Sequence, residues 1–399
     1  MFNKRINYKE QIGGDLLGSG GYGCVFRPNI PCDTGKYNSA NYKYISKVVS
    51  SKDIESEYNN VDNFNLKKID PNQRLIVYPI EDCGQPDNIS GEDYEQCKDD
   101  THENIDIEDG EYHNLIQRYY GQTLDTIRRK KKVNNIEDSI TLYMDLFKAV
   151  LLLNVNNLCH RDLKESNIVI DDKGKLRIID LSLLQSTKES FLHSSENQFS
   201  QPESYKYWDV CFNALTTYEY GYYNRMELAV DEKDNIKDKL IILIEYADKF
   251  CEKFKDIAHV DQSILTVLFQ SCVKFLSDIF IHKNVVNKYS ESKIDNIIQS
   301  KWDVFMVGII LLQDLSFHKK HTGSDDKDDF ITEFKSIIEG MICIDIYDRL
   351  TIKEAMESFS ELLAKYQDAL EISNRNLKTF TDDMDYISEY KRVPDYDED

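Results

Sequence analysis

The chain has 399 residues, of which 41% are hydrophobic, so it can bury the core of one large domain or of two to three small ones. Its formal net charge of −22 makes duplex nucleic acid and anionic membranes poor default partners, whereas a basic protein substrate suits it better. We find no run of the roughly 20 apolar residues that a membrane span needs, and no apolar signal-peptide core at the start of the sequence.

Nine cysteines are scattered along the sequence without a CxxC pair, which disfavours a zinc site. Because the sequence shows no export signal, we expect reduced thiols and a cytoplasmic protein.

The first half of the chain predicts mainly strands. "DLLGSGGYGCVF", "YKYISKVVS", "RLIVYPI" (74–80) and "YHNLIQRYYG" are short apolar or β-branched runs bounded by turn residues. Residues 51–67 predict a helix, since Ile54, Tyr58 and Val61 fall on one side.

Residues 81–111 form an acidic segment, with thirteen Asp and Glu against the single lysine Lys98. A segment this charged has little apolar surface to bury, so we expect a flexible acidic loop that does not pack.

Helical patterns dominate the rest of the chain. Since the small strand-rich part comes first and the larger helix-rich part second, we expect two lobes with a cleft between them. The predicted helices span 138–157, 236–257, 261–281, 300–316, 328–343 and 351–365, and residues 366–399 predict a polar tail.

The stretch "GSGGYGCV" fits the pattern G-x-G-x-x-G-x-V, with Gly18, Gly20, Gly23 and Val25. Without side chains, glycines let backbone N–H groups lie against phosphate oxygens. Alone, the pattern fits a flexible hairpin equally well. The strand-like "CVFRP" that follows disfavours a dinucleotide-binding fold, which would place a helix there.

Lys47 lies on the predicted strand "YISKVV", and in a cleft it would need a counter-charge. Glu55 and Glu57 are the candidates on the following helix. We favour Glu57, because one turn later comes the apolar Val61, whereas the same step from Glu55 reaches a polar residue. Taken alone, Lys47 is more simply a solvated edge-strand lysine.

The stretch "HRDLKESNIVIDDKGKLRIIDLSLL" holds the most reactive group of side chains. Asp162 can accept a hydroxyl proton, Lys164 can reach a phosphoryl group, and Asn167 can hold a metal and orient Asp162. Asp180 follows an apolar strand and supplies a second carboxylate. A single Asp is more simply a loop cap, but a metal-bound triphosphate needs this division of labour.

Together these motifs resemble a eukaryotic-type serine/threonine protein kinase, over roughly residues 12–360. The resemblance implies an α+β, bilobal fold with a small β-rich N-lobe (12–120) and a helical C-lobe (121–365). Beyond the family pattern, we expect a helical insertion at about 208–298 and an acidic tail at 366–399. "GGYGCVFRPNIPC" and "DLSLL" further resemble serine/threonine kinases of giant DNA viruses.

The resemblance implies ATP and Mg²⁺ as cofactors. Lys47, Asp162, Lys164 and Asn167 would be catalytic, with Asp162 as the base, and Asn167 and Asp180 would bind Mg²⁺. In the "LIQRYYGQTL" hinge, Gln117 would be the gatekeeper. The residues implied to bind ATP are Gly18, Ser19, Gly20, Gly21, Tyr22, Gly23, Val25, Lys47, Glu57, Gln117, Arg118, Tyr120 and Val169.

Three later features agree with the resemblance. "QPES" is similar to the A-P-E motif, with Gln201 in place of Ala. Asp303 in "KWDVFMVGIILL" would hold the catalytic loop from below. Arg349 in "DIYDRLTIKEAM" would pair with Glu203, and such a buried pair is costly to break from one side.

The chain departs from the family pattern in three places. Leu181 and Ser182 replace the usual Phe-Gly after Asp180, so we expect Leu181 to fill an apolar slot and Asp180 to stay inward without a glycine hinge. Ile45, at a position usually occupied by alanine, would narrow the adenine pocket. About eighty extra residues separate Glu203 from Asp303, and could form a docking module, a gate or a plain extension of the lower lobe.

Other charged residues have simpler explanations. "RRKKK" (128–132) is best explained as a solvated face, and docking of acidic sequences is the less favoured alternative. We expect His160 to pack beneath the catalytic loop. Arg161 could bind a phosphate on the activation segment, where the candidate sites are Thr187, Ser190, Ser194, Ser195 and Ser200.

We therefore expect an ATP- and Mg²⁺-dependent kinase that phosphorylates Ser or Thr of proteins, in the host cytoplasm or virion if the protein is viral. We expect no nucleic-acid or membrane partner, and consider partner docking on residues 204–298. The alternatives are a pseudokinase that acts as a nucleotide-binding or scaffold module and, third, a small-molecule phosphotransferase.

Overall fold

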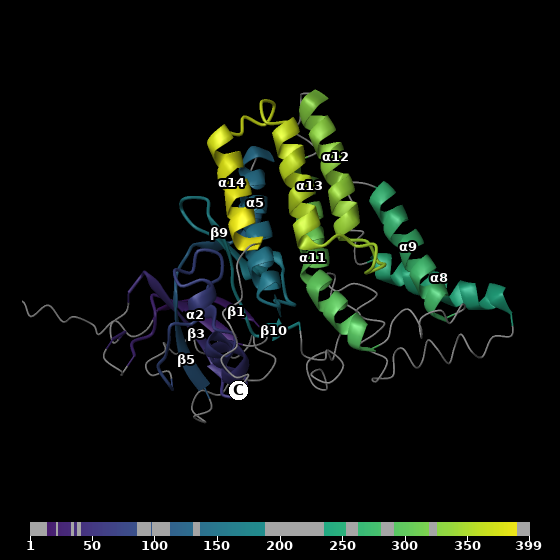
Figure 1. Ribbon diagram of the computed structural model, residues 1–399. Coiled ribbons are helices and arrows are strands. Elements are labelled where there is room, and N and C mark those ends of the chain that lie inside the picture. Colours follow the sequence, from purple (N-terminus) through teal and green to yellow (C-terminus); the bar gives the residue numbers. More distant parts are fainter. Residues whose placement is uncertain are drawn as a thin grey trace, which may run out of the picture. The chain divides into compact units, whose positions relative to one another are not determined.

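The structure is a computed structural model of the full chain (Figure 1). It describes residues 14–20, 23–32, 36–37, 41–85, 97, 112–130, 136–187, 235–252, 262–280, 291–318 and 325–388. The chain divides into two compact units. The first comprises residues 1–121 together with 179–183, and the second comprises residues 122–178 and 184–399.

A five-stranded antiparallel sheet forms the first unit, with the strand order β1-β2-β3-β5-β4. The strands predicted around the glycine-rich stretch, around Lys47 and before the hinge are present. The strand predicted at 74–80 was wrong, because the fourth strand of the sheet is only two residues long and follows this run. The strands are β1 (Asp15–Gly20), β2 (Gly23–Arg27), β3 (Tyr44–Ser50), β4 (Glu81–Asp82) and β5 (Tyr112–Arg118).

The register gives the sheet two different faces, because successive side chains of a strand alternate. On one face Lys47 lies between Val25 of β2 and Leu115 of β5. On the other face Phe26 and Val48 belong to a buried apolar cluster that also contains Cys24, Ile30 and Cys97. One face therefore presents a charged side chain and the other is core.

Two disulfides correct the expectation of reduced thiols. Cys24 is bonded to Cys97, and Cys32 is bonded to Cys83, across 73 and 51 residues of sequence. They also correct the expectation that the acidic segment does not pack for its described part, because Cys97 is fully buried in the apolar cluster beneath the sheet, while residues 86–96 and 98–111 lie outside the described residues. The prediction rested on the charge of the segment as a whole and did not consider its two cysteines, Cys83 and Cys97.

The helix predicted at 51–67 is divided into three short pieces: a π-helical turn η1 (Glu55–Asn59), α1 (Asn60–Asn63) and α2 (Leu66–Ile69). Its buried face differs from the predicted one. Val61 is buried, but it is joined by Glu57 and Asn60, while Ile54 and Tyr58 are only partly buried. The change brings a carboxylate into the interior.

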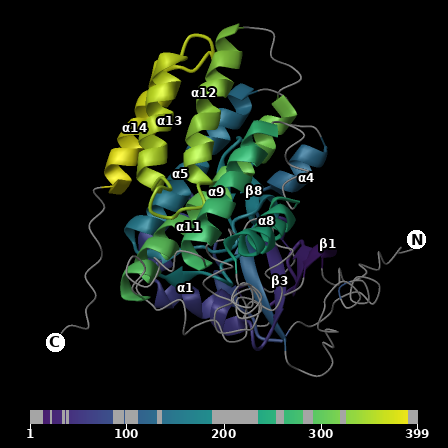
Figure 2. The same ribbon diagram turned by 90° about the vertical axis from the view of Figure 1, so that its right-hand side faces the viewer.

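The second unit is mostly helical, and the predicted helices are present. Most of their described ends shift by a few residues, but the helix predicted to begin at 300 begins nine residues earlier, at Glu291. Helix α5 (Ile136–Val155) lies beside α13 (Ile352–Lys365) and α14 (Asn374–Ser388) in both views (Figures 1 and 2). The remaining helices are α4 (Leu124–Arg129), α8 (Ile236–Glu252), α9 (Gln262–Phe280), α11 (Glu291–His318) and α12 (Asp325–Met341).

Helix α14 corrects the expectation of a polar tail. Its side chains Phe380, Met384 and Ile387 recur at helical spacing and are buried, and the helix packs against α5 and α13. Surrounding charged residues hid this stripe in the sequence. Residues 389–399 lie outside the described part of the chain.

Short strands carry the loops of the second unit that matter for function. β6 (Gln122–Thr123), β8 (Ile168–Ile170) and β9 (Leu176–Ile178) form one small sheet, and β7 (Leu158–Cys159) pairs with β10 (Gln185–Ser186). Among the described residues, no helix is both long and apolar enough to cross a bilayer.

The disulfides generate a direct prediction. When the unfolded protein is alkylated without reductant, Cys24, Cys32, Cys83 and Cys97 should stay unlabelled, whereas the thiol of Cys159 should react. Peptide mass mapping before and after reduction measures this. Because a cross-link over a long loop restricts the unfolded chain, Cys24→Ser with Cys97→Ser should lower the free energy of unfolding by about 2–4 kcal/mol. Labelling of Cys24 without reductant would contradict the assignment.

Candidate active site

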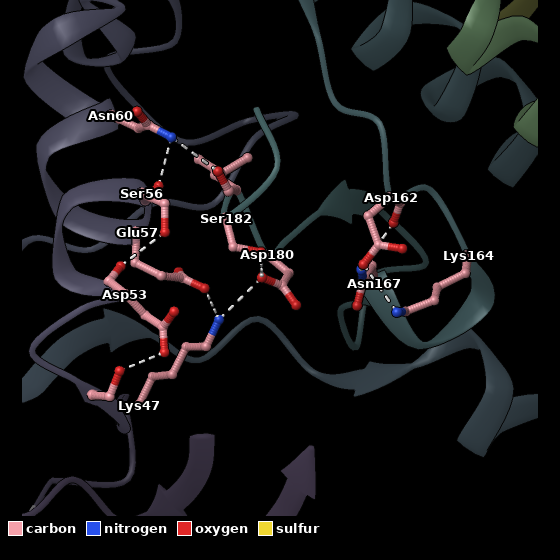
Figure 3. A network of polar contacts seen from close by, with 12 residues as sticks. Lys47, Asp53, Ser56, Glu57, Asn60, Asp162, Lys164, Asn167, Asp180 and Ser182 are labelled. Atoms are coloured by element: carbon pink, nitrogen blue, oxygen red, sulfur yellow. Dashed lines mark hydrogen bonds and ion pairs between the residues drawn. The ribbon is translucent and has the colours of Figure 1, made fainter. Parts of the chain in front are cut away.

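Lys47 is held between two carboxylates within the first unit (Figure 3). Its Nζ donates hydrogen bonds to Oε1 of Glu57 and, at 3.1 Å, to Oδ1 of Asp180, which lies 133 residues further along the chain. The structure thus pairs Lys47 with Glu57 rather than Glu55, as the spacing predicted. All three side chains are mostly buried, so the cation and its acids interact with little screening by water.

Burial sets the protonation of this group. Burial lowers the pKa of the Lys47 ammonium, but the carboxylates of Asp180 and Glu57 more than offset it, and the pKa ends above its usual range. Burial raises the pKa of the Glu57 carboxyl to about 8, although Lys47 acts to lower it. One cation cannot neutralise two buried acids, so Glu57 retains a proton near neutral pH more readily than an ordinary glutamate.

The segment after Asp180 is fastened to the same unit. Asp180 has a positive φ of 67°, and the Ser182 hydroxyl donates to its Oδ1 at 3.0 Å. Asn60 of α1 donates from Nδ2 to the carbonyl of Leu181 at 3.2 Å, and the Leu181 side chain is buried. Asp180 therefore points inward toward Lys47, as we expected from the missing glycine. The sequence did not indicate the contribution of Asn60.

The glycine-rich turn needs glycine at one position above all. Gly23 has a φ of +152°, and a Cβ there would lie 2.2 Å from the carbonyl oxygen of Val48. A Cβ at Gly18 would meet nothing, and Ser19 beside it is exposed. Gly20 pairs with Gly23 across the turn. The predicted ATP contacts Gly21 and Tyr22 lie outside the described residues.

The predicted adenine residues of the first unit lie at the end of β5. Gln117 is buried directly across from Ile45, on the sheet face that also bears Lys47. Arg118 follows and is exposed, and Tyr119 donates its backbone N–H to the carbonyl of Lys43 at 2.9 Å. β5 ends at Arg118, which pairs with Tyr44 of β3, and Tyr120 lies two residues beyond that end.

The catalytic loop of the second unit brings its three predicted residues together (Figure 3). Asn167 donates from Nδ2 to the backbone carbonyl of Asp162 at 2.9 Å and to its Oδ2 at 2.8 Å. Lys164 donates to the same Oδ2 at 2.9 Å. The Asp162 carboxylate is therefore fixed by two donors, while neither bond uses the amide oxygen of Asn167.

Asp303 of α11 holds the start of this loop, as predicted. Its two carboxylate oxygens accept the backbone N–H groups of His160 at 2.7 Å and Arg161 at 2.9 Å. Burial raises the pKa of Asp303, although these two N–H groups and the neighbouring imidazole act to lower it. His160 is fully buried and its Nδ1 accepts the N–H of Asp162 at 3.3 Å, which fits the expected packing role.

Other predicted positions have mixed outcomes. Val169 is buried in β8 of the second unit. Arg349 is buried and donates to the carbonyls of Cys343 and Lys301, at 2.7 and 3.2 Å. Its predicted partner Glu203 lies outside the described residues. So do Gln201 and the predicted phosphorylation sites Ser190, Ser194, Ser195 and Ser200, whereas Thr187 is buried.

Arg128 is the largest departure from the sequence-based expectation. We expected "RRKKK" to be a solvated face, but the Arg128 side chain is only 7% exposed and lies between carboxylates of the second unit. Arg129 and Lys130 are exposed, as expected, and residues 131–135 lie outside the described part. The apolar positions of the short helix α4 gave a weak signal, since Ile127 is buried next to Arg128.

Each unit holds side chains whose chemistry would suit phosphoryl transfer. The first offers a lysine ordered by two acids and a glycine-rich turn, which are groups that bind phosphate oxygens. The second offers a carboxylate oriented by an amide and a lysine, which can accept a hydroxyl proton. Asp180 and Asn167 provide the hard oxygen ligands that Mg²⁺ prefers.

Comparisons with known proteins agree with this chemistry. Residues 102–205 match the family model of the protein kinase domain. The chain is 28% identical over 106 residues to a probable serine/threonine-protein kinase MRK1 homolog of Encephalitozoon cuniculi, covering 25% of this chain and 33% of that protein. It is 25% identical over 188 residues to calcium-dependent protein kinase 4 of Plasmodium berghei, covering 45% and 30%. The chain spans about a third of the length of these curated relatives.

The raised pKa of Glu57 predicts a pH-dependent stability. Unfolded Glu57 releases its proton near its ordinary pKa of 4.5, whereas folded Glu57 holds it up to about 8, so the folded state binds more protons in this window. The stability that this proton contributes is complete below the pKa of the unfolded state, 4.5, and is lost as the pH rises through the pKa of the folded state, about 8. Glu57→Gln, which cannot titrate, should therefore lose less stability than the wild type between about pH 5 and pH 9.

Urea unfolding at a series of pH values measures this difference. Glu55→Gln is the matched control, because Glu55 is exposed on the same turn. It should follow the wild type at every pH. A wild-type advantage over Glu57→Gln that grows as pH rises would show that the pKa of Glu57 is depressed instead.

Proposed function

We propose that the protein is an ATP- and Mg²⁺-dependent protein kinase that transfers the γ-phosphoryl group to Ser or Thr hydroxyls. The observation that carries this proposal is the ordering of Lys47 by Glu57, its predicted partner, and by Asp180, which lies 133 residues further along the chain. The match of residues 102–205 to the protein kinase domain and the names of the two relatives support the same reaction class.

In the proposed mechanism, Lys47 would bind oxygens of the α- and β-phosphates. Glu57 holds the ammonium from the side of the helix, and Asp180 holds it from the segment after β9. Because the pKa of the Lys47 ammonium lies above its usual range, Lys47 stays protonated at physiological pH and would bind phosphate oxygens throughout that range. The backbone of the glycine-rich turn around Gly23 would supply further N–H donors.

Mg²⁺ bound by Asp180 and Asn167 would neutralise charge on the phosphate oxygens. Asn167 is suited to this role because both of its bonds to Asp162 use the amide nitrogen. Its amide oxygen, which accepts rather than donates, could then bind the cation. Asp180 is suited because its carboxylate is fixed by Lys47 and Ser182.

Asp162 would accept the proton of the incoming hydroxyl. Its Oδ2 accepts hydrogen bonds from Lys164 and Asn167, so the side chain is already oriented before a substrate binds. Lys164 would follow the transferred group as negative charge develops there. The lysine two residues after the aspartate is also the feature that favours Ser/Thr over Tyr as acceptor.

The residues proposed to bind adenine come from three different strands. We propose that Val25, Gln117 and Val169 line the adenine end of the site, with backbone groups from Arg118 to Tyr120 facing the base. Ile45 lies across from Gln117 on the same sheet face, so it is the side chain that would narrow this pocket.

Three further expectations remain proposals. Partner docking on the insertion finds some support, because Ile241 and Ile244 of α8 and Val267 of α9 are exposed apolar side chains on two helices that contact each other. The likeness to kinases of giant DNA viruses remains a prediction. The cytoplasmic location also remains a prediction. The two disulfides argue against a permanently reducing compartment, because disulfides form under oxidising conditions.

The activity is tested by incubating the protein with labelled ATP, Mg²⁺ and a peptide library, followed by phosphosite mapping. We expect phosphate on Ser or Thr. Lys47→Met, Asp162→Asn and Asp180→Ala should each lower the rate by at least about 100-fold without unfolding the protein, because each removes a group that acts on the transition state. Lys52→Met is the matched control, since Lys52 is exposed just after β3.

The same assay separates the alternatives. A pseudokinase would bind nucleotide but transfer no more phosphate than Asp162→Asn. A small-molecule phosphotransferase would label sugars, aminoglycosides or choline in preference to peptides. Near-normal transfer by Asp180→Ala would show that the metal site has been assigned to the wrong residue.

A further inference from the structure

The guanidinium of Arg128 is placed between two acids of the second unit. Its Nη1 contacts Oε1 of Glu165, and its Nη2 lies 2.7 Å from Oδ1 of Asp314. The three side chains are 7%, 17% and 5% exposed, so this is a largely buried ion-pair group. Tyr143 of α5 completes it by donating its hydroxyl hydrogen to Oδ2 of Asp314.

Glu165 lies within the catalytic loop itself. It is the first residue of the short turn Glu165–Asn167, whose last residue fixes Asp162. A side chain that holds Glu165 therefore acts on the backbone that carries Asn167, only two residues away. Arg128 belongs to α4, which contacts this turn.

Asp314 extends the group to the helix that holds the other end of the loop. Asp303 and Asp314 are eleven residues apart on α11, which is about three helical turns, so both project from the same face. Asp303 binds the backbone at His160 and Arg161 directly. Asp314 reaches the loop through Arg128, which also binds Glu165.

We propose that Arg128 is a positioning residue that fixes the far end of the catalytic loop, by linking Glu165 to the same face of α11 that holds its beginning. The loop from His160 to Asn167 is then held at both ends by one rigid helix. This role rests on the proposed function of Asp162 and Asn167, but the mechanical part of it can be measured without any activity.

The geometry requires arginine rather than any cation. A guanidinium offers separate N–H groups in a planar fork, so it can bind two carboxylates from different elements at once, whereas a lysine ammonium is a single point of charge. Because the group is buried, removing the cation is costly in free energy: it leaves two buried acids without their counter-charge. Burial and the charge of Asp314 also raise the pKa of the Tyr143 hydroxyl, so Tyr143 stays a donor to Asp314.

The test compares Arg128→Met with its neighbour Arg129→Met by hydrogen–deuterium exchange and mass spectrometry. Arg129 is the matched control, because it lies on the same short helix with a 73% exposed side chain and pairs only with Asp125 of the same turn among the described residues. In Arg128→Met, the peptide spanning 160–168 should exchange faster, while peptides from α13 and α14 stay as in the wild type. Arg129→Met should match the wild type throughout.

Kinetics provide the second readout. Since a displacement of about 1 Å near the reacting groups can cost about 100-fold in rate, Arg128→Met should lower kcat by about that factor and Arg129→Met should leave it unchanged. Glu165→Gln should reproduce the effect. The double variant Arg128→Met with Glu165→Gln should be no slower than either single variant, because the two residues act through one contact.

Equal exchange of the 160–168 peptide in Arg128→Met and Arg129→Met would overturn the proposal, as would strictly additive effects in the double variant. If Arg128→Met loosens every peptide, Arg128→Lys decides instead: faster exchange confined to 160–168 supports the proposal, and wild-type exchange overturns it. A protein with no phosphoryl transfer at all, but with the local loosening, would defeat the proposed function and leave the positioning role intact.

Discussion

A buried ammonium group shared by two acidic side chains is the constraint on which the first unit depends. Lys47 could not remain ordered in the interior without counter-charge, and its partners come from a helical turn and from a segment more than a hundred residues away. Fixing Lys47 therefore also fixes Asp180 and the chain that follows it. Asn60 and Ser182 reinforce the same arrangement through neutral hydrogen bonds.

In the second unit, a side chain of helix α11 orders the loop from His160 to Asn167. This loop is held by the carboxylate of Asp303 on α11 and by the bonds of Asn167 to Asp162, and the side chain of Leu163 is fully buried. The chemistry and the support thus come from different elements. The loop carries the residues that we propose to react, and α11, in which residues 302–315 are buried, holds the start of that loop through Asp303.

The sequence predicted the residues of the site better than it predicted their supports. Motif spacing identified Lys47, Glu57 and Asp162, because phosphoryl transfer restricts which groups can occur in that order. It missed Arg128, since one buried arginine in a run of basic residues looks the same as its exposed neighbours. It also missed the disulfide of Cys97 and the packing of α14, because both lie within segments whose average charge predicts solvation.

Binding of ATP measured by calorimetry, with and without Mg²⁺, tests the central claim that Lys47 and Asp180 form one phosphate- and metal-binding group. The account predicts that Mg²⁺ strengthens ATP binding to the wild type, and that Asp180→Asn abolishes this Mg²⁺ dependence while the variant remains folded. Equal strengthening by Mg²⁺ in both proteins would contradict it.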